Sequence, residues 1–176
     1  VAAARRWDFP AQGPDSGRAT GFFRVEERAG KWWLADPAGR LFLALGVDHV
    51  NYFVHWAEKL GYAPYHRNVE ARYGSEDAWG RAALDRLRAW GFNLLAAGHG
   101  ERLRHRGLPF TEFITFGADF SPFSDIAAKT TWTGFPNVFH PRWEEYCRWK
   151  ARRMCAPQRD DPWLFGYFLD NELEWY

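Results

Sequence analysis

The residues best suited to chemistry in this 176-residue chain stand in the segment Asp170-Asn171-Glu172-Leu173-Glu174. A carboxyl group can act as a general acid or base, and a neighbouring amide suits a substrate that carries hydroxyl groups. The segment follows the apolar run 163–169, which indicates a buried strand. Ligands bind at the carboxyl ends of strands in parallel α/β sheets. Glu172 and Asn171 are therefore candidate site residues, against the alternative that these polar residues only return the chain to solvent.

Polar side chains also follow two earlier apolar runs. Asp48, His49 and Asn51 come after 41–47, a run that predicts one continuous strand, and His99 lies between two glycines after 92–97. If these runs are parallel strands, the polar groups converge with Glu172 at one edge of the sheet. A histidine at a strand end can equally order its neighbours.

The remaining segments supply the elements that must position these groups. The pattern predicts a hairpin over 22–35, a helix from Ser75 to Trp90, a strand over 109–116 and a helix from His140 to Ala156. The buried stripe of that last helix is expected at Trp143, Cys147, Ala151 and Met154. Strands alternating with helices indicate an α/β fold with a parallel sheet. Residues 117–139 form a long segment in which Trp132 is a candidate substrate contact.

Composition argues against several classes of protein. The net charge is +1, so no overall field recruits nucleic acid, and no run approaches the length of a membrane span. The histidines and cysteines lack metal-ligand spacing and there is no glycine-rich phosphate loop, so we expect neither a metal nor a cofactor. The 11 tryptophans are compatible with sugar-stacking surfaces as well as with core packing.

Two segments resemble a known family. Gly166–Trp175, with the sequence GYFLDNELEW, resembles the fourth-strand motif of the clan A retaining glycoside hydrolases, in the form of the β-agarase-like members, and 21–51 resembles the hairpin and first barrel strand of agarases. The resemblance implies that Glu172 is the acid/base and that Asn171 contacts the sugar 2-hydroxyl. It assigns no role to Asp170. Asp48, His49, Asn51, His99 and Trp132 would contact the substrate.

The resemblance also implies an architecture. Residues 1–20 would be an N-terminal arm, and 21–176 would hold a hairpin followed by about four βα units, the N-terminal half of a TIM (β/α)8 barrel that stops after strand 4. The nucleophile would lie in the C-terminal half of the barrel, a partner without which the fragment is inactive. Polysaccharide-degrading relatives are usually exported, which is the only indication of a secreted or periplasmic location.

Two other functions fit the same residues. The chain can be a non-catalytic carbohydrate-binding protein that uses tryptophan and tyrosine rings as stacking platforms. Alternatively, Asp170, Glu172 and Glu174 can bind a divalent cation, although a hard cation requires more converging oxygens than this turn offers. Glu174 is poorly placed to serve as the nucleophile, because it lies two residues from Glu172 on the same turn.

Overall fold

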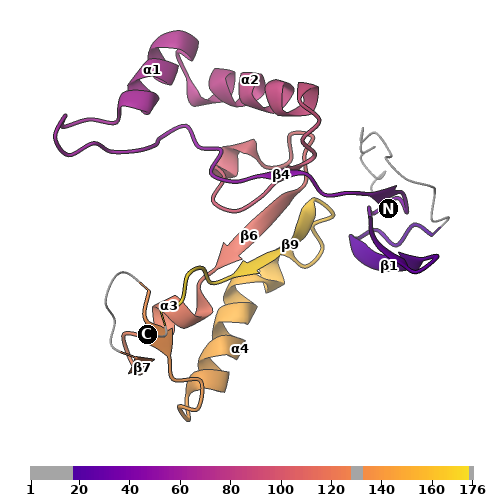
Figure 1. Cartoon of the computed structure of the whole chain (residues 1–176), viewed down its shortest axis with the longest axis vertical. Coiled ribbons are helices and arrows are strands. Elements are labelled where there is room, and N and C mark those ends of the chain that lie inside the picture. The colour runs from indigo at the N-terminus through magenta and orange to yellow at the C-terminus, as the bar shows by residue number, and fades with distance from the viewer. Residues whose placement is uncertain (1–17, 128–132, 175–176) are drawn as a thin grey trace. The chain divides into compact units, whose positions relative to one another are not determined.

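A computed structural model describes residues 18–127 and 133–174 of the chain, which have a mixed α/β fold (Figure 1). They form two compact units, one with residues up to 111 and 162–165, the other with 112–161 and the residues from 166 onward. The strands are β1 (Arg24–Arg28), β2 (Lys31–Ala35), β3 (Leu41–Phe42), β4 (Gly46–Val47), β5 (Leu94–Leu95), β6 (Phe110–Ile114), β7 (Asp125–Ala127), β8 (Phe135–Pro136) and β9 (Leu164–Leu169). The helices are α1 (Pro64–Tyr73), α2 (Glu76–Ala89), α3 (Phe116–Phe120) and α4 (Trp143–Met154), with short 3-10 turns at Glu101–Leu103 and Ala156–Gln158.

The first unit opens with the predicted hairpin. β1 and β2 pair antiparallel, with Arg24 opposite Ala35. Ala29 and Gly30, which connect them, have φ angles of 51° and 72°. Two consecutive left-handed residues match the right-handed twist of the two strands. The hairpin predicted from the sequence is therefore confirmed.

The single strand expected over 41–47 is wrong. Its first part, β3, pairs antiparallel with β2 of the hairpin, whereas its last part, β4, pairs parallel with β5. Between them, the Asn93 side chain accepts a hydrogen bond from Leu45 N at 2.7 Å and donates one to Leu43 O at 2.8 Å. A buried side-chain amide thus satisfies backbone groups that a strand would pair in a ladder. The hydrophobic periodicity of the sequence does not indicate that this run is divided between two sheets.

The parallel strands of the first unit lie beside helix α2. β4 pairs with β5, and β5 pairs with β6 through Leu95 and Phe110. Helix α2 begins as predicted, because the Ser75 hydroxyl accepts a hydrogen bond from Ala78 N at 3.2 Å. Its apolar stripe joins the main core cluster, whose buried members are Trp79, Ala83, Leu84, Leu87, Leu95, Leu103, Leu108, Phe110 and Trp163.

The second unit contains α3, α4 and the ends of two long neighbouring strands, β6 and β9 (Figure 1). Here Asp170 N donates to Ile114 O at 2.8 Å, and the rings of Phe113 and Phe168 stack at 6.3 Å. Helix α3 follows β6 directly; it begins at Phe116, the last residue of the predicted strand, and extends into the long segment 117–139. That segment also contributes the β7–β8 ribbon.

The buried stripe expected on the last helix is confirmed only in part. Trp143, Cys147, Ala151 and Met154 are only partly buried, and the buried residue of α4 is Lys150. Lys150 Nζ donates to Thr115 O at 2.5 Å and to Asp119, which explains how a cation is accommodated there. No helix in the described part of the chain is long and apolar enough to cross a membrane.

Candidate functional site

The turn after β9 is held in place by its first residue, Asp170. Its two carboxylate oxygens accept hydrogen bonds from Gly117 N at 2.7 Å and Ala118 N at 2.9 Å. These are amides of the first turn of α3, which have no partner within the helix. Asp170 therefore ties the end of β9 to α3, a structural role that explains an acidic residue beside the candidate acid.

The end of the same turn is clamped by two residues that precede β8. Thr133 Oγ1 donates to Glu172 O at 2.6 Å, and Gly134 N donates to a Glu174 carboxylate oxygen at 2.9 Å. Glu174 N returns a hydrogen bond to Gly134 O at 3.1 Å. Thr133 and Glu174 are buried, at 0% and 8% exposure. The backbone on both sides of Glu172 is thus fixed by groups far away in sequence.

Asn171 and Glu172 are the exposed residues of this turn. Asp170 and Glu172 have φ angles of 62° and 50°, in the left-handed region that non-glycine residues seldom occupy. Such conformations cost of the order of 1–3 kcal/mol each and cluster at active sites and ligand clamps. The turn therefore holds the Glu172 carboxyl group on a constrained backbone while leaving it accessible to a ligand.

The first unit brings the other strand-end groups together. His49 N donates to Ala97 O at 2.8 Å, and the Asp48 carboxylate accepts from Ala97 N at 2.8 Å. The Asn51 side chain donates to Gly98 O. His49 is exposed and also has a left-handed φ of 55°. Asp48 and Asn51 thus anchor the turn after β5, while the His49 ring remains accessible.

His99 differs from these residues because it is buried. Its Nδ1 lies 2.8 Å from Ala96 O, and its Nε2 accepts a hydrogen bond from Arg104 Nε at 3.0 Å. Arginine can only donate, so Nδ1 carries the ring hydrogen and donates it to the carbonyl oxygen. Both ring nitrogens are engaged within the protein. This geometry suits a residue that orders the turn around it.

The other candidate groups have various surroundings. Trp132 lies outside the described residues. The Glu112 carboxylate, within strand β6, accepts a hydrogen bond from Gln158 Nε2 at 3.1 Å, as expected of an acidic side chain in an apolar strand. Within residues 18–127 and 133–174, no group of three or more histidine, cysteine, aspartate or glutamate residues is arranged to hold a metal ion. Asp170 and Glu174, proposed as alternative cation ligands, already accept hydrogen bonds from backbone amides.

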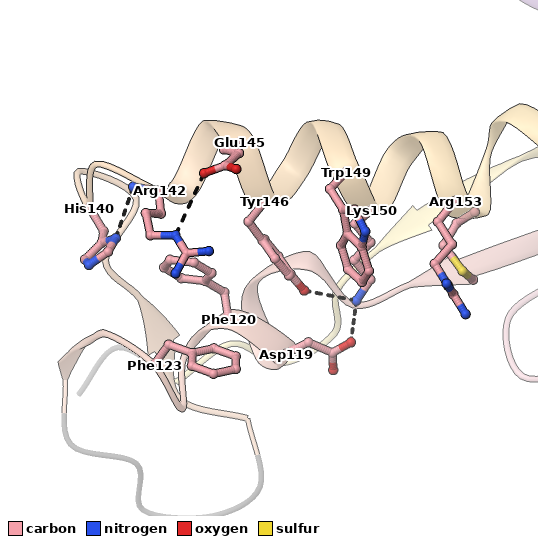
Figure 2. A pocket seen from close by; sticks show the side chains of 11 residues that line it. Asp119, Phe120, Phe123, His140, Arg142, Glu145, Tyr146, Trp149, Lys150 and Arg153 are labelled. Atoms are coloured by element: carbon pink, nitrogen blue, oxygen red, sulfur yellow. Dashed lines mark hydrogen bonds and ion pairs between the residues drawn. The ribbon is translucent and has the colours of Figure 1, made fainter.

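Sequence reasoning missed one feature of the second unit, a cavity of about 660 Å³ beside α3 and α4 (Figure 2). Its lining includes aromatic and charged side chains from both helices. The spacing of Tyr146, Trp149, Lys150 and Arg153 along α4 places them on one side of the helix and is the signal that could have identified it.

The surroundings of Lys150 beside this cavity determine the pKa of its side chain. Burial by itself lowers the pKa of Lys150, but its hydrogen bonds with Asp119 and with Tyr146 Oη outweigh that effect, so the pKa lies above its ordinary value. Burial raises the pKa of Tyr146. Lys150 is therefore a fixed positive charge in the wall of the cavity at neutral pH.

Known proteins resemble the chain along nearly its full length. It is 25% identical to β-agarase B of Vibrio sp. (strain JT0107), over 94% of this chain and 23% of that protein. It is also 25% identical to β-agarase A of the same organism, over 92% of this chain and 21% of that protein. The sequence thus spans less than a quarter of the length of these curated relatives. No protein-family model matches it.

Solved structures share the fold. An agarase, AgWH50C, superposes with a TM-score of 0.72 at 22% identity, over 97% of this chain and 32% of that chain. An exo-β-agarase superposes with a TM-score of 0.75 at 19% identity, over 98% of this chain and 34% of that chain. The mixed α/β arrangement therefore corresponds to about a third of each agarase structure.

Proposed function

We propose that this chain is part of a glycoside hydrolase that cleaves O-glycosyl bonds in a galactose-containing polysaccharide or oligosaccharide, as an agarase or β-galactosidase does. The observation that carries the proposal is the similarity to two β-agarases, which extends over more than nine-tenths of the sequence. The constrained, accessible turn around Glu172 supports it, because this is the position at which the hydrolase motif places a carboxyl group.

Glu172 acts as the general acid/base in this mechanism. Its carboxyl group protonates the departing glycosidic oxygen and then removes a proton from the water that releases the sugar. Asn171, beside it on the exposed part of the turn, donates a hydrogen bond to the sugar 2-hydroxyl. Asp170 and Glu174 hold the turn through the backbone contacts described above.

Retention of anomeric configuration requires a second carboxylate about 5–5.5 Å from the first. No residue of this sequence is assigned that role. We place the nucleophile in the remainder of a (β/α)8 barrel, of which 21–176 form the hairpin and the first four βα units. The coverage of about a third of each solved agarase chain supports this division. The isolated fragment would then be inactive.

The strand-end residues of the first unit have two kinds of role. His49, whose ring is exposed, contacts the substrate. Asp48 and Asn51 also contribute to the substrate site, and their hydrogen bonds to Ala97 N and Gly98 O order the turn that carries it. The buried His99 helps to position that turn through its hydrogen bond to Ala96 O. Trp132, which lies outside the described residues, is proposed as a substrate contact on the resemblance alone.

Replacing Glu172 by Gln in the full-length protein tests the mechanism. We expect kcat on an agarose oligosaccharide to fall by about 10²–10⁴-fold, the usual contribution of a general acid or base. Substrate binding should persist, because the amide has nearly the same shape as the carboxyl group. Initial rates and a direct binding measurement report the two effects separately.

The control for this substitution is Glu144→Gln on α4. Glu144 is 75% exposed and pairs with Arg148, four residues along the same helix. An aryl glycoside with an acidic leaving group identifies the proton-donor role, since its departure needs little protonation and its glycosylation step should largely survive Glu172→Gln. Unchanged turnover of the agarose oligosaccharide by Glu172→Gln would end the assignment and leave the sugar-binding alternative.

A further inference from the structure

The cavity beside α3 and α4 has the composition of a small-molecule site. Its volume of about 660 Å³ lies within the range of about 300–1,000 Å³ typical of ligand pockets. Neither Asn171 nor Glu172 lines it, so the proposed mechanism makes no use of it. Residues of α3, α4 and the segments next to them line it: Asp119, Phe120, Phe123, His140, Arg142, Glu145, Tyr146, Trp149, Lys150, Arg153 and Met154.

Aromatic rings form a connected surface in this cavity. The ring of Phe120 lies 5.1 Å from that of Tyr146, which in turn lies 6.0 Å from that of Trp149 at an angle of 34°. Trp149 remains 55% exposed despite its size. Phe120 is buried at 4% exposure and Tyr146 is partly buried, so Trp149 presents the largest accessible apolar ring surface, on which the C–H face of a pyranose ring can stack beside the Tyr146 ring.

The positively charged side chains in the cavity wall outnumber the negatively charged ones. Lys150 pairs with Asp119, and Arg142 Nε lies 3.8 Å from a Glu145 carboxylate oxygen. Arg153 lies over the ring of Trp149, with Cζ 6.0 Å from the ring centroid, and no carboxylate of the described residues lies within ion-pair distance of it. Figure 2 shows its guanidinium group beside Trp149 and Lys150 on one side of α4. One positive charge is therefore available to a ligand.

We propose that this cavity binds a sugar residue that carries a single anionic group, a sulfate ester or a carboxylate. The pyranose face stacks on Trp149 and Tyr146, while Arg153 pairs with the anionic group in a charge-assisted hydrogen bond. The Asp119 side chain, which is 56% exposed, accepts hydrogen bonds from sugar hydroxyl groups through the oxygen that faces solvent. The choice of a sugar over other anionic ligands rests on the proposed function, and the site would hold a charged part of the polysaccharide away from the cleavage point.

The charge balance argues against a nucleotide. A nucleotide brings two or more negative charges and usually requires a cradle of backbone amides or several cations. Two of the three cations among Arg142, Lys150 and Arg153 already have carboxylate partners in this cavity. The remaining charge matches one ester or carboxylate group.

The test measures binding by isothermal titration calorimetry in the full-length protein that carries Glu172→Gln, so that the probe is not cleaved. The probes are a sulfated κ-carrageenan tetrasaccharide, the neutral neoagarotetraose and inorganic sulfate. Trp149→Ala should weaken binding of the sulfated tetrasaccharide by about tenfold. Arg153→Gln should weaken it by a similar factor, about that of one charge-assisted hydrogen bond, and should change binding of the neutral probe less than threefold.

A matched control is available on α2, where the Arg86 guanidinium lies 5.9 Å from the ring centroid of Trp90, a residue that is 67% exposed. This pair has the same composition and helical separation but lines neither described cavity. Trp90→Ala and Arg86→Gln should leave binding of all three probes unchanged. These control variants distinguish a local binding site at the cavity from a general effect of removing exposed aromatic or basic side chains.

Three results would overturn the proposal. They are unchanged binding of the sulfated tetrasaccharide in Trp149→Ala and Arg153→Gln, equal losses in the α2 variants, and sulfate ion binding as tightly as the tetrasaccharide. Arg153→Gln changes an exposed side chain, so its result does not depend on whether Trp149→Ala folds. Because binding is measured without turnover, these outcomes are independent of whether Glu172 is the acid.

Discussion

Asp170 shows how an acidic residue beside a candidate acid can serve structure alone. It bridges Gly117 N and Ala118 N with separate oxygens, and the hydrogen bonds span 53 and 52 residues of sequence. Its φ of 62° belongs to the left-handed region, which aspartate and asparagine tolerate better than most residues. Asp170 therefore both bends the chain after β9 and fixes the bend to α3.

Replacing Asp170 by Ala should lower the free energy of unfolding by about 1–3 kcal/mol, because two partly buried amides lose a charged acceptor. Asp170→Asn should lose less, since asparagine keeps one acceptor oxygen and adopts the left-handed backbone. Urea denaturation measures both. Asp160→Ala, which changes a side chain 82% exposed, is the control and should have little effect. Equal stability of Asp170→Ala and the native protein would contradict the capping role.

Single residues were predictable from sequence when their partners were close along the chain or their burial was unusual. A carboxylate within an apolar strand requires a partner, and Glu112 in β6 has one in Gln158. The cap made by Asp170 was not predictable, because it depends on α3, a five-residue helix without a recognisable periodic pattern. The residues around Glu172 were therefore predicted as a site from the sequence, whereas the contacts that fix their backbone were not.

At the scale of elements, the turn after β5 carries the same kind of constraint as the turn after β9. Gly98 has a φ of +68°, and a Cβ atom built on it would lie 2.7 Å from His49 Nδ1. The glycine is therefore required both for its backbone conformation and for the space it leaves to the histidine ring. Any side chain at 98 must displace His49.

Gly98→Ala should destabilise the protein more than Gly91→Ala, and the difference should be about 1 kcal/mol or more. Gly91 has a φ of +84° and open space where a Cβ would lie, so its replacement introduces backbone strain alone. The excess in Gly98→Ala therefore reports the displaced His49 ring. Thermal unfolding of the two variants compares them, and equal losses would show that the ring moves aside without cost.

The elements themselves were predictable to different extents. Helix α2 was predicted because the Ser75 cap and the periodic apolar residues both lie within the segment that forms it. The run 41–47 was not, because its division between two sheets depends on Asn93, about 50 residues away. The burial of Lys150 on α4 was missed for a similar reason, since its partners lie on α3 and the turn before it. Local patterns therefore determine helices better than sheet membership.

At the scale of the whole molecule, several groups of the second unit resist deprotonation. Burial, followed by its proximity to Cys155, raises the pKa of Tyr167 to about 12. The pKa of Lys150 and that of Tyr146 also lie above their ordinary values. An unfolded chain releases its tyrosine protons near pH 10. The folded state therefore holds more protons than the unfolded state above that pH.

Below about pH 10, the raised pKa of Tyr167 should not make the free energy of unfolding depend on pH. From about pH 10 to about pH 12 the free energy of unfolding should fall, because the unfolded state loses the Tyr167 proton at a lower pH than the folded state does. Tyr167→Phe should make this decline shallower. Thermal unfolding between pH 8 and pH 12 measures it, with Tyr65→Phe, at a tyrosine 64% exposed, as the control. An equally steep decline in Tyr167→Phe would contradict the prediction.

The clamp formed by Thr133 and Gly134 bears on how the turn after β9 could be transplanted into a related scaffold. The backbone around Glu172 is fixed by residues about 40 positions upstream of it, through hydrogen bonds to the Glu172 carbonyl oxygen and the Glu174 carboxylate. A chimera that transplants 163–174 into a related scaffold without 133–134 would carry the proposed acid Glu172 but lose two of the contacts that hold its backbone. A graft of both segments that also includes the α3 residues 117–118, which Asp170 caps, would preserve the contacts that hold the turn.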